Sequence, residues 1–488
     1  MIQAQQSGIS TNDAERTPAG APRALALDAF RGFAILAMVV SWIIPEGVLP
    51  AWMYHAQTPP PLHKFNPNLP GITWVDLVFP FFLFSMGAAI PLALSRRLEQ
   101  GLPRWKIVIQ MLTRGLLLAG FAMYIAHIRP LTIDPKPTRE TWLVALLGFV
   151  LLFPILVRLP SAWKLWIRAG VRAAGWGGAI LLLGLLRYPD GSGFSIARSD
   201  IIIMLLASMA VFGSLLWLLS RTNILLRLGF LGILFGLRLA APLAGWVGWL
   251  YAKAQVPHFY ELGHLQLLFI VLPGTIVGDL ILSWMRSPER NTADRAGWSF
   301  PRLAGIGVLM AGFVLLMLVG LKARWLWQTA LAAFGMCGLG WWLVSRPTTV
   351  TERLVRDFFI WGVYWLLLGL MLEPYEGGIK KDPATMSYYF VTTGLAIFLL
   401  VGFTILIDVW RKRRWLQLLI DNGQNPLMAY AGAQNLVGAM LGVAGLVGVL
   451  ETIGRNNPGV GVVIVILYAL ALAAVVAVFT RRKIFWRT

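Results

Sequence analysis

The sequence predicts an all-α polytopic membrane protein, a transmembrane helix bundle, and its composition carries that prediction. Of the 488 residues, 58% are hydrophobic and only 13% are charged, with a mean hydropathy of +0.70. A soluble globular protein is nearer a quarter charged. The 22 tryptophans and 11 tyrosines suit a protein with a large surface at the membrane–water boundaries, where amphipathic rings settle.

Apolar runs follow one another along the chain, and each approaches the roughly 17–25 residues that a helix needs to cross a bilayer. We expect about 10–14 spans, an even number, in a single domain of residues 23–488. The fifth run is short, whereas the seventh and thirteenth are long enough to bend or to include a turn. The predicted spans are 26–45, 72–95, 106–127, 141–159, 173–187, 200–219, 224–250, 262–285, 303–321, 325–345, 355–373, 387–409, 423–450 and 459–480.

The positive charges predict the orientation. Arginine and lysine gather in alternate loops, notably within 96–106, 158–172, 286–302 and 411–414. Cytoplasmic loops carry such an excess, so we expect both termini in the cytoplasm and the chain in the inner (plasma) membrane of the cell. This pattern also explains the net charge of +20 by contact with the lipid bilayer, without nucleic acid as a partner.

Two segments lie outside the predicted spans. Residues 1–22 show no apolar period, which predicts a disordered cytoplasmic tail and no cleavable signal peptide. The polar loop 46–71 holds six prolines and is placed on the extracytoplasmic side; long ordered loops are often functional. The single cysteine, Cys337, excludes a disulfide framework and a cysteine-based metal site.

Three titratable residues near this loop are the candidate catalytic groups: His55 and His63 within it, and Asp76 near the start of the second span. An ionisable group in a span is costly and usually functional. Histidine moves protons near neutral pH or attacks an activated acyl group, and Asp76 would orient it as the acid of a triad does. No tight metal-ligand spacing surrounds the two histidines, so no metal is expected.

At the cytoplasmic side, Asp28 and Arg31 share a helix face at the start of the first span. They form either a boundary ion pair or an anion contact, in which Arg31 and Gly32 admit a phosphate-bearing cofactor. In the segment DNGQNP, Asn422 is expected to cap a helix and Asn425 to line a polar pocket that binds the cofactor.

At the outer side, the candidate substrate-binding residues are His264, Glu373 and Glu376. His264 opens the eighth span, and the two acids belong to the boundary segment EPYEGGIKKDP. The two glycines of that segment permit unusual backbone conformations. Ionisable groups at these positions suit either an acceptor site or the coupling site of a transporter.

A run of short motifs then appears in order: Arg31-Gly32 in the first span, His55-Ala56 in the loop, Gly-Ile-Thr at 71–73 and Asp-Leu-Val-Phe-Pro at 76–80. The pattern resembles the heparan-α-glucosaminide N-acetyltransferase family of transmembrane acetyltransferases and its bacterial relatives. The clear match covers about residues 25–95. The family's asparagine falls near Ser41, and a proline-rich insert at 58–70 separates the His-Ala and Gly-Ile-Thr motifs.

The resemblance implies transfer of an acetyl group from cytoplasmic acetyl-CoA, as co-substrate, to an amino sugar such as glucosamine or to another glycan on the far side. The family's active histidine maps onto His55, because it too precedes alanine. The insert brings in His63 as a rival. The histidine would act as a base or as a transient acyl carrier, and no metal is implied.

Two alternatives stand beside the acyltransferase. One is a secondary transporter or flippase for a sugar or glycan precursor, with Asp76, His264 and Glu373 as coupling groups. The other is a non-catalytic scaffold in envelope assembly. The His-Ala loop joined to GITWVDLVFP favours the acyltransferase, because a transporter needs no such loop histidine. The tryptophan-rich surface suits lipid contact as well as a homodimer.

Overall fold

Residues 23–242, 245–251, 262–291 and 297–487 are described by the structure, a computed structural model. Within these ranges the chain is helical, and β-type pairing is limited to isolated bridges. The predicted all-α class is therefore confirmed. The predicted tail, residues 1–22, lies outside the described residues.

Ten helices of the described chain are long and apolar enough to cross a membrane, within the predicted range. They are α1 (Leu25–Ile43), α2 (Trp74–Glu99), α3 (Arg104–His127), α5 (Arg139–Leu156), α7 (Ile201–Ser220), α11 (Leu268–Arg286) with the turn before it, α12 (Phe300–Lys322), α14 (Val350–Leu372), α15 (Met386–Thr404) and α20 (Pro458–Arg481). The multi-pass helical bundle is thus confirmed.

The two long runs are each interrupted in the structure. In the seventh, α8 (Ile224–Ala240) ends early and is followed by the short α9 (Trp246–Leu250). In the thirteenth, α16 (Gln417–Gln424) leads into the segment Pro426–Val443, and α19 (Val447–Asn456) then turns away from that segment by 96°. The segment comprises α17 (Pro426–Gly432), the π-helix η7 (Ala433–Gly438) and α18 (Ala439–Val443).

Two further helices coincide with predicted spans but are not among the ten: α6 (Leu165–Leu185) and α13 (Leu326–Leu343). The short run predicted at 173–187 thus belongs to a longer helix, which begins at Leu165. The remaining short elements are α4 (Pro130–Ile133), α10 (Leu262–Leu265), η2 (Ala51–Met53), η3 (Pro288–Asn291), η4 (Glu373–Glu376), η5 (Ile405–Val409) and η6 (Arg413–Leu416).

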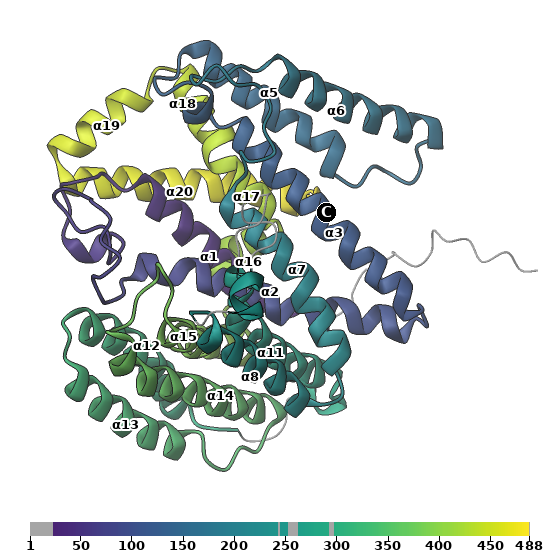
Figure 1. The fold of residues 1–488 in the computed structure, drawn as a ribbon. Helices are drawn as coiled ribbons and strands as arrows, with labels where there is room; N and C mark the ends of the chain where they lie inside the picture. Colours follow the sequence, from purple (N-terminus) through teal and green to yellow (C-terminus); the bar gives the residue numbers. More distant parts are fainter. Residues whose placement is uncertain (1–22, 243–244, 252–261, 292–296, 488) are drawn as a thin grey trace, which may run out of the picture.

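Helices α1 and α2 run through the middle of the molecule, with α12–α15 on one side and α5, α6, α18 and α19 on the other (Figure 1). The first and last described residues come together, because Arg23 and Arg487 line the same cavity. Both ends of the described chain therefore lie at one face, which agrees with the expected even number of spans. That this face is cytoplasmic stays a prediction.

Glycines bring α2 and α11 into backbone contact. A Cβ on Gly87 would lie 2.3 Å from the carbonyl oxygen of Val271, and a Cβ on Gly278 would lie 2.3 Å from that of Ala88. Gly274 and Gly278 stand four residues apart, a spacing that lets membrane helices approach closely. This packing fixes α2, which carries Asp76 in its first turn.

Candidate active site

Asp76 is buried at the start of α2, where it takes part in the helix cap. Thr73 is the N-cap residue and Asp76 the third helical residue, which together form a capping box. Asp76 Oδ2 accepts hydrogen bonds from the backbone N–H of Thr73 (3.0 Å) and of Ala56 (3.1 Å). The Thr73 hydroxyl lies 3.2 Å from the same oxygen and has a nearer acceptor in the Tyr54 carbonyl, at 2.7 Å. The two backbone donors stabilise the ionised carboxylate and leave Oδ1 for another partner.

That partner is His55. Its Nδ1 lies 2.8 Å from Asp76 Oδ1. Because the carboxylate is ionised, we assign the proton to Nδ1, which donates to Oδ1, and this tautomer leaves Nε2 as the basic nitrogen. The His55 side chain is 41% exposed, whereas that of Asp76 is 2% exposed. The His55 imidazole is thus accessible to solvent, while the carboxylate that orients it is buried.

Lys381 lies beside this pair. Its Nζ is 3.1 Å from His55 Nδ1 and 3.9 Å from Asp76 Oδ1. An ammonium group only donates hydrogen bonds, so it cannot bond an Nδ1 that carries its own proton and acts instead as a nearby charge. Burial lowers the pKa of Lys381, and the charges of Asp76 and Asp382 oppose that shift.

Two loops are clamped together to build this cluster: the histidine loop, residues 44–73 between α1 and α2, and the lysine loop, residues 377–385 between η4 and α15. The Gln57 side chain donates to the Asp382 carbonyl (2.5 Å) and accepts from its N–H (2.9 Å). The Gly71 N–H donates to the Ile379 carbonyl (2.8 Å). These bonds place Lys381 against a histidine 326 residues away in sequence.

His63 is used within the histidine loop. Its Nε2 accepts the N–H of Gly47 at 2.9 Å, and its ring meets the Tyr54 ring edge-on with centroids 4.5 Å apart. The Tyr54 hydroxyl in turn donates to the Pro45 carbonyl at 2.5 Å. Of the two candidate histidines, the structure therefore brings His55 to Asp76, while His63 holds the loop together.

The predicted substrate-binding acids support the lysine loop. Glu373 is buried, pairs with Arg324 and accepts the N–H of Ile379 at 3.2 Å. Glu376 accepts the N–H groups that open α15, those of Met386 (2.7 Å) and Ser387 (2.8 Å). The structure thus gives both carboxylates structural partners.

The third predicted substrate-binding residue, His264, lies in α10, just after the undescribed residues 252–261. Its carbonyl accepts the N–H of Leu267 at 3.0 Å, at the point where the chain enters α11. It comes from a different segment than the two clamped loops that carry His55 and Lys381.

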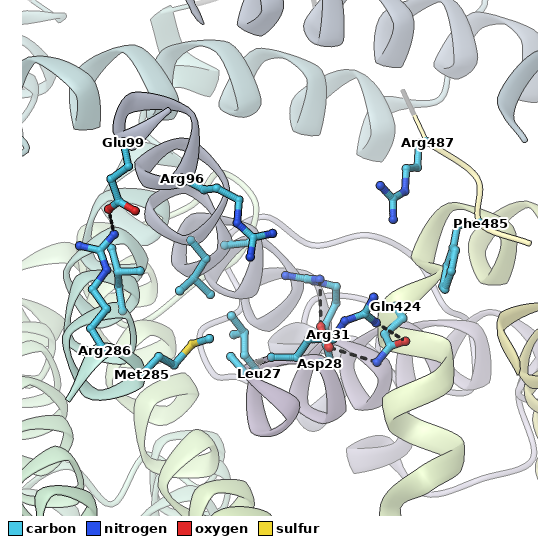
Figure 2. A pocket seen from close by; sticks show the side chains of 15 residues that line it. Leu27, Asp28, Arg31, Arg96, Glu99, Met285, Arg286, Gln424, Phe485 and Arg487 are labelled. Carbon is cyan, nitrogen blue, oxygen red and sulfur yellow. Dashed lines mark hydrogen bonds and ion pairs between the residues drawn. The ribbon is translucent and has the colours of Figure 1, made fainter. Parts of the chain in front are cut away.

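At the opposite end of α1 and α2 lies the inner cavity, of about 450 Å³. Arg31 lines it and forms the predicted boundary pair with Asp28, at 3.6 Å. Arg31, Arg96 and Arg487 surround the opening, and the ion pair of Glu99 and Arg286 stands at one side (Figure 2). The polar and charged lining residues are Arg23, Asp28, Arg31, Arg96, Glu99, Arg286, Gln424 and Arg487.

Gly32, predicted beside the cofactor, is a packing residue in the structure. A Cβ there would lie 1.9 Å from the Leu419 carbonyl oxygen, and one on Gly423 would lie 1.8 Å from the Asp28 carbonyl oxygen. The two glycines allow α1 and α16 to touch along their backbones. Gly32 does not line the inner cavity, so its part in the geometry is to set the position of Arg31.

Asn425 is fully buried and anchors the C-terminal segment. Its Nδ2 donates to the Ile484 carbonyl (2.9 Å), and its Oδ1 accepts the N–H of Trp486 (3.1 Å). The expected cap at Asn422 is wrong, because that residue lies inside α16 and donates to the Ala473 carbonyl (3.0 Å). Within this segment it is Gln424 that lines the inner cavity.

The two sites are separated along α2. Among the residues of α2 that line the inner cavity, Ala89 is the closest to Asp76 in sequence. The 13 residues from Asp76 to Ala89 span about 20 Å along the helix axis, at 1.5 Å per residue. Most side chains in between are buried.

Comparison with known proteins places the chain in a family. It matches the family described as Domain of unknown function (DUF5009) over residues 23–281, which is more than half of the chain. The chain belongs to the DUF5009 family. The matched region of this DUF5009 chain contains His55, Asp76 and Arg31, but not Lys381.

The DUF5009 chain also has a distant relative of known name. It is 27% identical over 195 residues to heparan-alpha-glucosaminide N-acetyltransferase from Homo sapiens, an alignment that covers 35% of this chain and 27% of the human protein. The chain thus matches about a quarter of that relative's length.

Sequence reasoning missed several residues of these sites. Lys381 stands in the noted segment EPYEGGIKKDP, but nothing in that segment says which of its two lysines turns inward. Arg96 lies in a loop that the sequence analysis uses only for the orientation, and Arg487 has no predicted role. The Tyr388 hydroxyl donates to the Asp76 carbonyl at 2.7 Å, but in the sequence this residue is one of many within the predicted span 387–409. The Thr-x-x-Asp spacing at 73–76 was the one available signal for the capping role of Asp76.

Proposed function

We propose that this chain is a membrane acyltransferase that moves an acetyl group from cytoplasmic acetyl-CoA to an amino sugar or glycan acceptor on the opposite side. The observation that carries the proposal is the contact of 2.8 Å between His55 Nδ1 and Asp76 Oδ1, in which the acid is buried and the imidazole is accessible. The distant similarity to a membrane N-acetyltransferase supports the reaction class.

In the direct route, His55 Nε2 removes a proton from the amine or hydroxyl of the acceptor as that group attacks the thioester carbonyl. A C–N or C–O bond forms, the C–S bond breaks, and the imidazolium returns its proton to the departing thiolate. Asp76 stabilises the imidazolium through Nδ1–H. In the second route, Nε2 itself attacks the thioester: an N–C bond forms, the C–S bond breaks and CoA leaves as the thiolate. The acceptor then attacks the acetyl group, the C–N bond to His55 breaks, and the proton lost by the acceptor neutralises the thiolate.

The inner cavity is the proposed site for the nucleotide part of acetyl-CoA. Arginine binds phosphate groups through paired N–H donors, and five arginines line the cavity: Arg23, Arg31, Arg96, Arg286 and Arg487. Its volume of about 450 Å³ lies in the usual range of ligand pockets. The thioester arm would then follow α1 and α2 over the ~20 Å between Ala89 and Asp76, which requires these helices to part.

The experiment that tests this function is release of free CoA by the purified protein supplied with acetyl-CoA and glucosamine. The variant His55→Ala is expected to lose roughly 10²–10⁴-fold in turnover, the usual contribution of a general base. His63→Ala is the matched comparison and should keep most of the activity. Full turnover in His55→Ala, with loss in His63→Ala, would make the active histidine wrong but leave the reaction class.

The transporter alternative has a different outcome in the same system. If CoA is neither bound nor consumed with any sugar amine or alcohol, while labelled glucosamine crosses liposomes that contain the protein, the acyltransferase proposal fails. A transporter does not need acetyl-CoA, so transport that is indifferent to it would identify that class.

A further inference from the structure

A second cavity, the outer cavity, lies at the end of the molecule where α1 ends and α19 turns away from α18. Its volume is about 440 Å³. Its walls come from the end of α1 and from α4, α5, η7, α18, α19 and α20. Of these, α5, α18 and α19 lie on the side of the molecule away from α12–α15 (Figure 1). Apolar side chains such as Leu441, Leu450 and Ile464 form much of the wall.

Aromatic side chains with a polar edge also line this cavity: Trp42, Trp142 and Tyr468. Such residues settle at the level of lipid head groups. The helix that borders the cavity, α19, follows the bend of 96° after α18, so it does not continue the span. The outer cavity therefore lies at the boundary between bilayer and water.

Charged groups of both signs face the outer cavity: Glu46, Glu451 and Arg455. Glu451 and Arg455 stand four residues apart on α19 and share a helix face. Among the described residues, none of the three forms an ion pair with another side chain. The cavity thus presents two carboxylates and one guanidinium group that are all available to a ligand.

The surface beside the outer cavity is apolar. On α20, next to the lining residues Ile464 and Val465, the side chains of Val463 and Leu467 are 53% and 59% exposed. Leu131 lines the cavity and is itself 67% exposed. In a membrane-spanning chain such surface faces lipid tails, so a ligand can enter from the side, out of the outer leaflet.

We propose that the outer cavity binds an aminophospholipid, such as phosphatidylethanolamine, from the outer leaflet. Its phosphate pairs with Arg455, its ammonium group pairs with Glu46 and Glu451, and its chains lie against the apolar wall. Charge complementarity selects this ligand, because the head group must carry both signs. The proposal does not depend on the acyltransferase function. Pro45 lines the cavity and accepts the Tyr54 hydroxyl, so the bound lipid would also brace the histidine loop.

Native mass spectrometry of the purified full chain, titrated with phosphatidylethanolamine or with phosphatidylglycerol, tests the proposal. The wild type is expected to retain one phosphatidylethanolamine roughly tenfold more tightly than phosphatidylglycerol, which lacks the amine. Leu450→Trp fills the cavity and should weaken that binding by roughly tenfold. Val449→Trp is the matched control, because Val449 is 52% exposed and lies outside the lining.

A second variant guards against misfolding of Leu450→Trp. In Glu46→Gln/Glu451→Gln both side chains are exposed, so the fold should persist while the preference for the amine disappears. Equal binding of the two lipids by the wild type, unchanged binding in Leu450→Trp, or an intact preference in the double variant would each overturn the proposal.

Discussion

The two oxygens of Asp76 carry separate tasks. Oδ2 accepts the backbone N–H groups of Thr73 and Ala56, which start α2 and fix the histidine loop, and Oδ1 orients His55. The same buried carboxylate therefore serves the fold and the proposed chemistry. Substitutions that keep its shape but change its donors separate the two tasks.

The variant Asp76→Asn is expected to keep the helix start but lose activity. One amide oxygen can still accept the N–H groups of Thr73 and Ala56, but the NH₂ group then faces His55 Nδ1. The proton moves to Nε2, and turnover of acetyl-CoA should fall by about 10⁴-fold, as for the wrong tautomer in a triad. Activity close to the wild-type value would show that the tautomer of His55 does not matter.

In Asp76→Ala the helix start is lost as well. This variant should show the same loss of turnover and, in addition, a melting temperature below that of Asp76→Asn, because removal of a cap costs about 1 kcal/mol. Equal melting temperatures would contradict the capping role.

Lys381 gives a stability prediction that depends on pH. Because burial lowers its pKa in the folded protein, the unfolded chain binds more protons over the pH range between that lowered value and the ordinary ~10.4 of a lysine. Stability contributed by this residue therefore rises with pH in that range. The melting temperature of the wild type, compared with that of Lys381→Gln, should climb as the pH approaches ~10. A difference that stays flat or falls would contradict the buried position.

At the scale of elements, the glycine contacts between α2 and α11 explain why α2 is a fixed support. Gly278→Ala places a methyl group 2.3 Å from the Ala88 carbonyl oxygen, so the two helices must separate. We expect a loss of about 1–3 kcal/mol in unfolding free energy, as for other overpacked sites. Gly120→Ala in α3 is the control, because its Cβ would meet no atom within 4 Å. Thermal unfolding in detergent measures both, and equal stability of the two variants would refute the packing argument.

Elements were more predictable than contacts. The spans could be placed because each apolar run is long enough to be recognised without tertiary information. Both runs that are too long for one straight helix are interrupted in the structure. Asp76 was expected to meet a histidine, but the choice of His55 depends on how the histidine loop folds back on Gly47 and Tyr54. No local pattern encodes that path.

The contacts between distant segments were the least predictable. Lys381 reaches His55 only because Gln57 and Gly71 bind the backbone of the lysine loop. Asn425 was expected in a pocket and instead holds the C-terminal segment, since a buried amide can satisfy either surrounding. A polar residue can be recognised in the sequence, but its partner depends on how distant helices pack around it.

In the molecule as a whole, a basic cavity lies at one end of α1 and α2, and the pair of His55 and Asp76 lies at the other. Arg96→Gln removes one cavity arginine and should raise KM for acetyl-CoA by about tenfold with little change in kcat, because the lost contact is made equally in ground and transition states. Arg104→Gln is the control, an exposed arginine at the start of α3 that does not line the cavity. Steady-state kinetics with varied acetyl-CoA decide this, and an equal effect of both variants would indicate a general charge effect instead.

The most direct test of the central claim is an experimental structure of the protein with a non-hydrolysable thioether analogue of acetyl-CoA. We expect the nucleotide to bind among Arg31, Arg96 and Arg487, with the arm running between α1 and α2 and ending at His55 Nε2. A nucleotide bound elsewhere, or an arm that ends in the inner half of the bundle with α1 and α2 closed above it, would contradict the account.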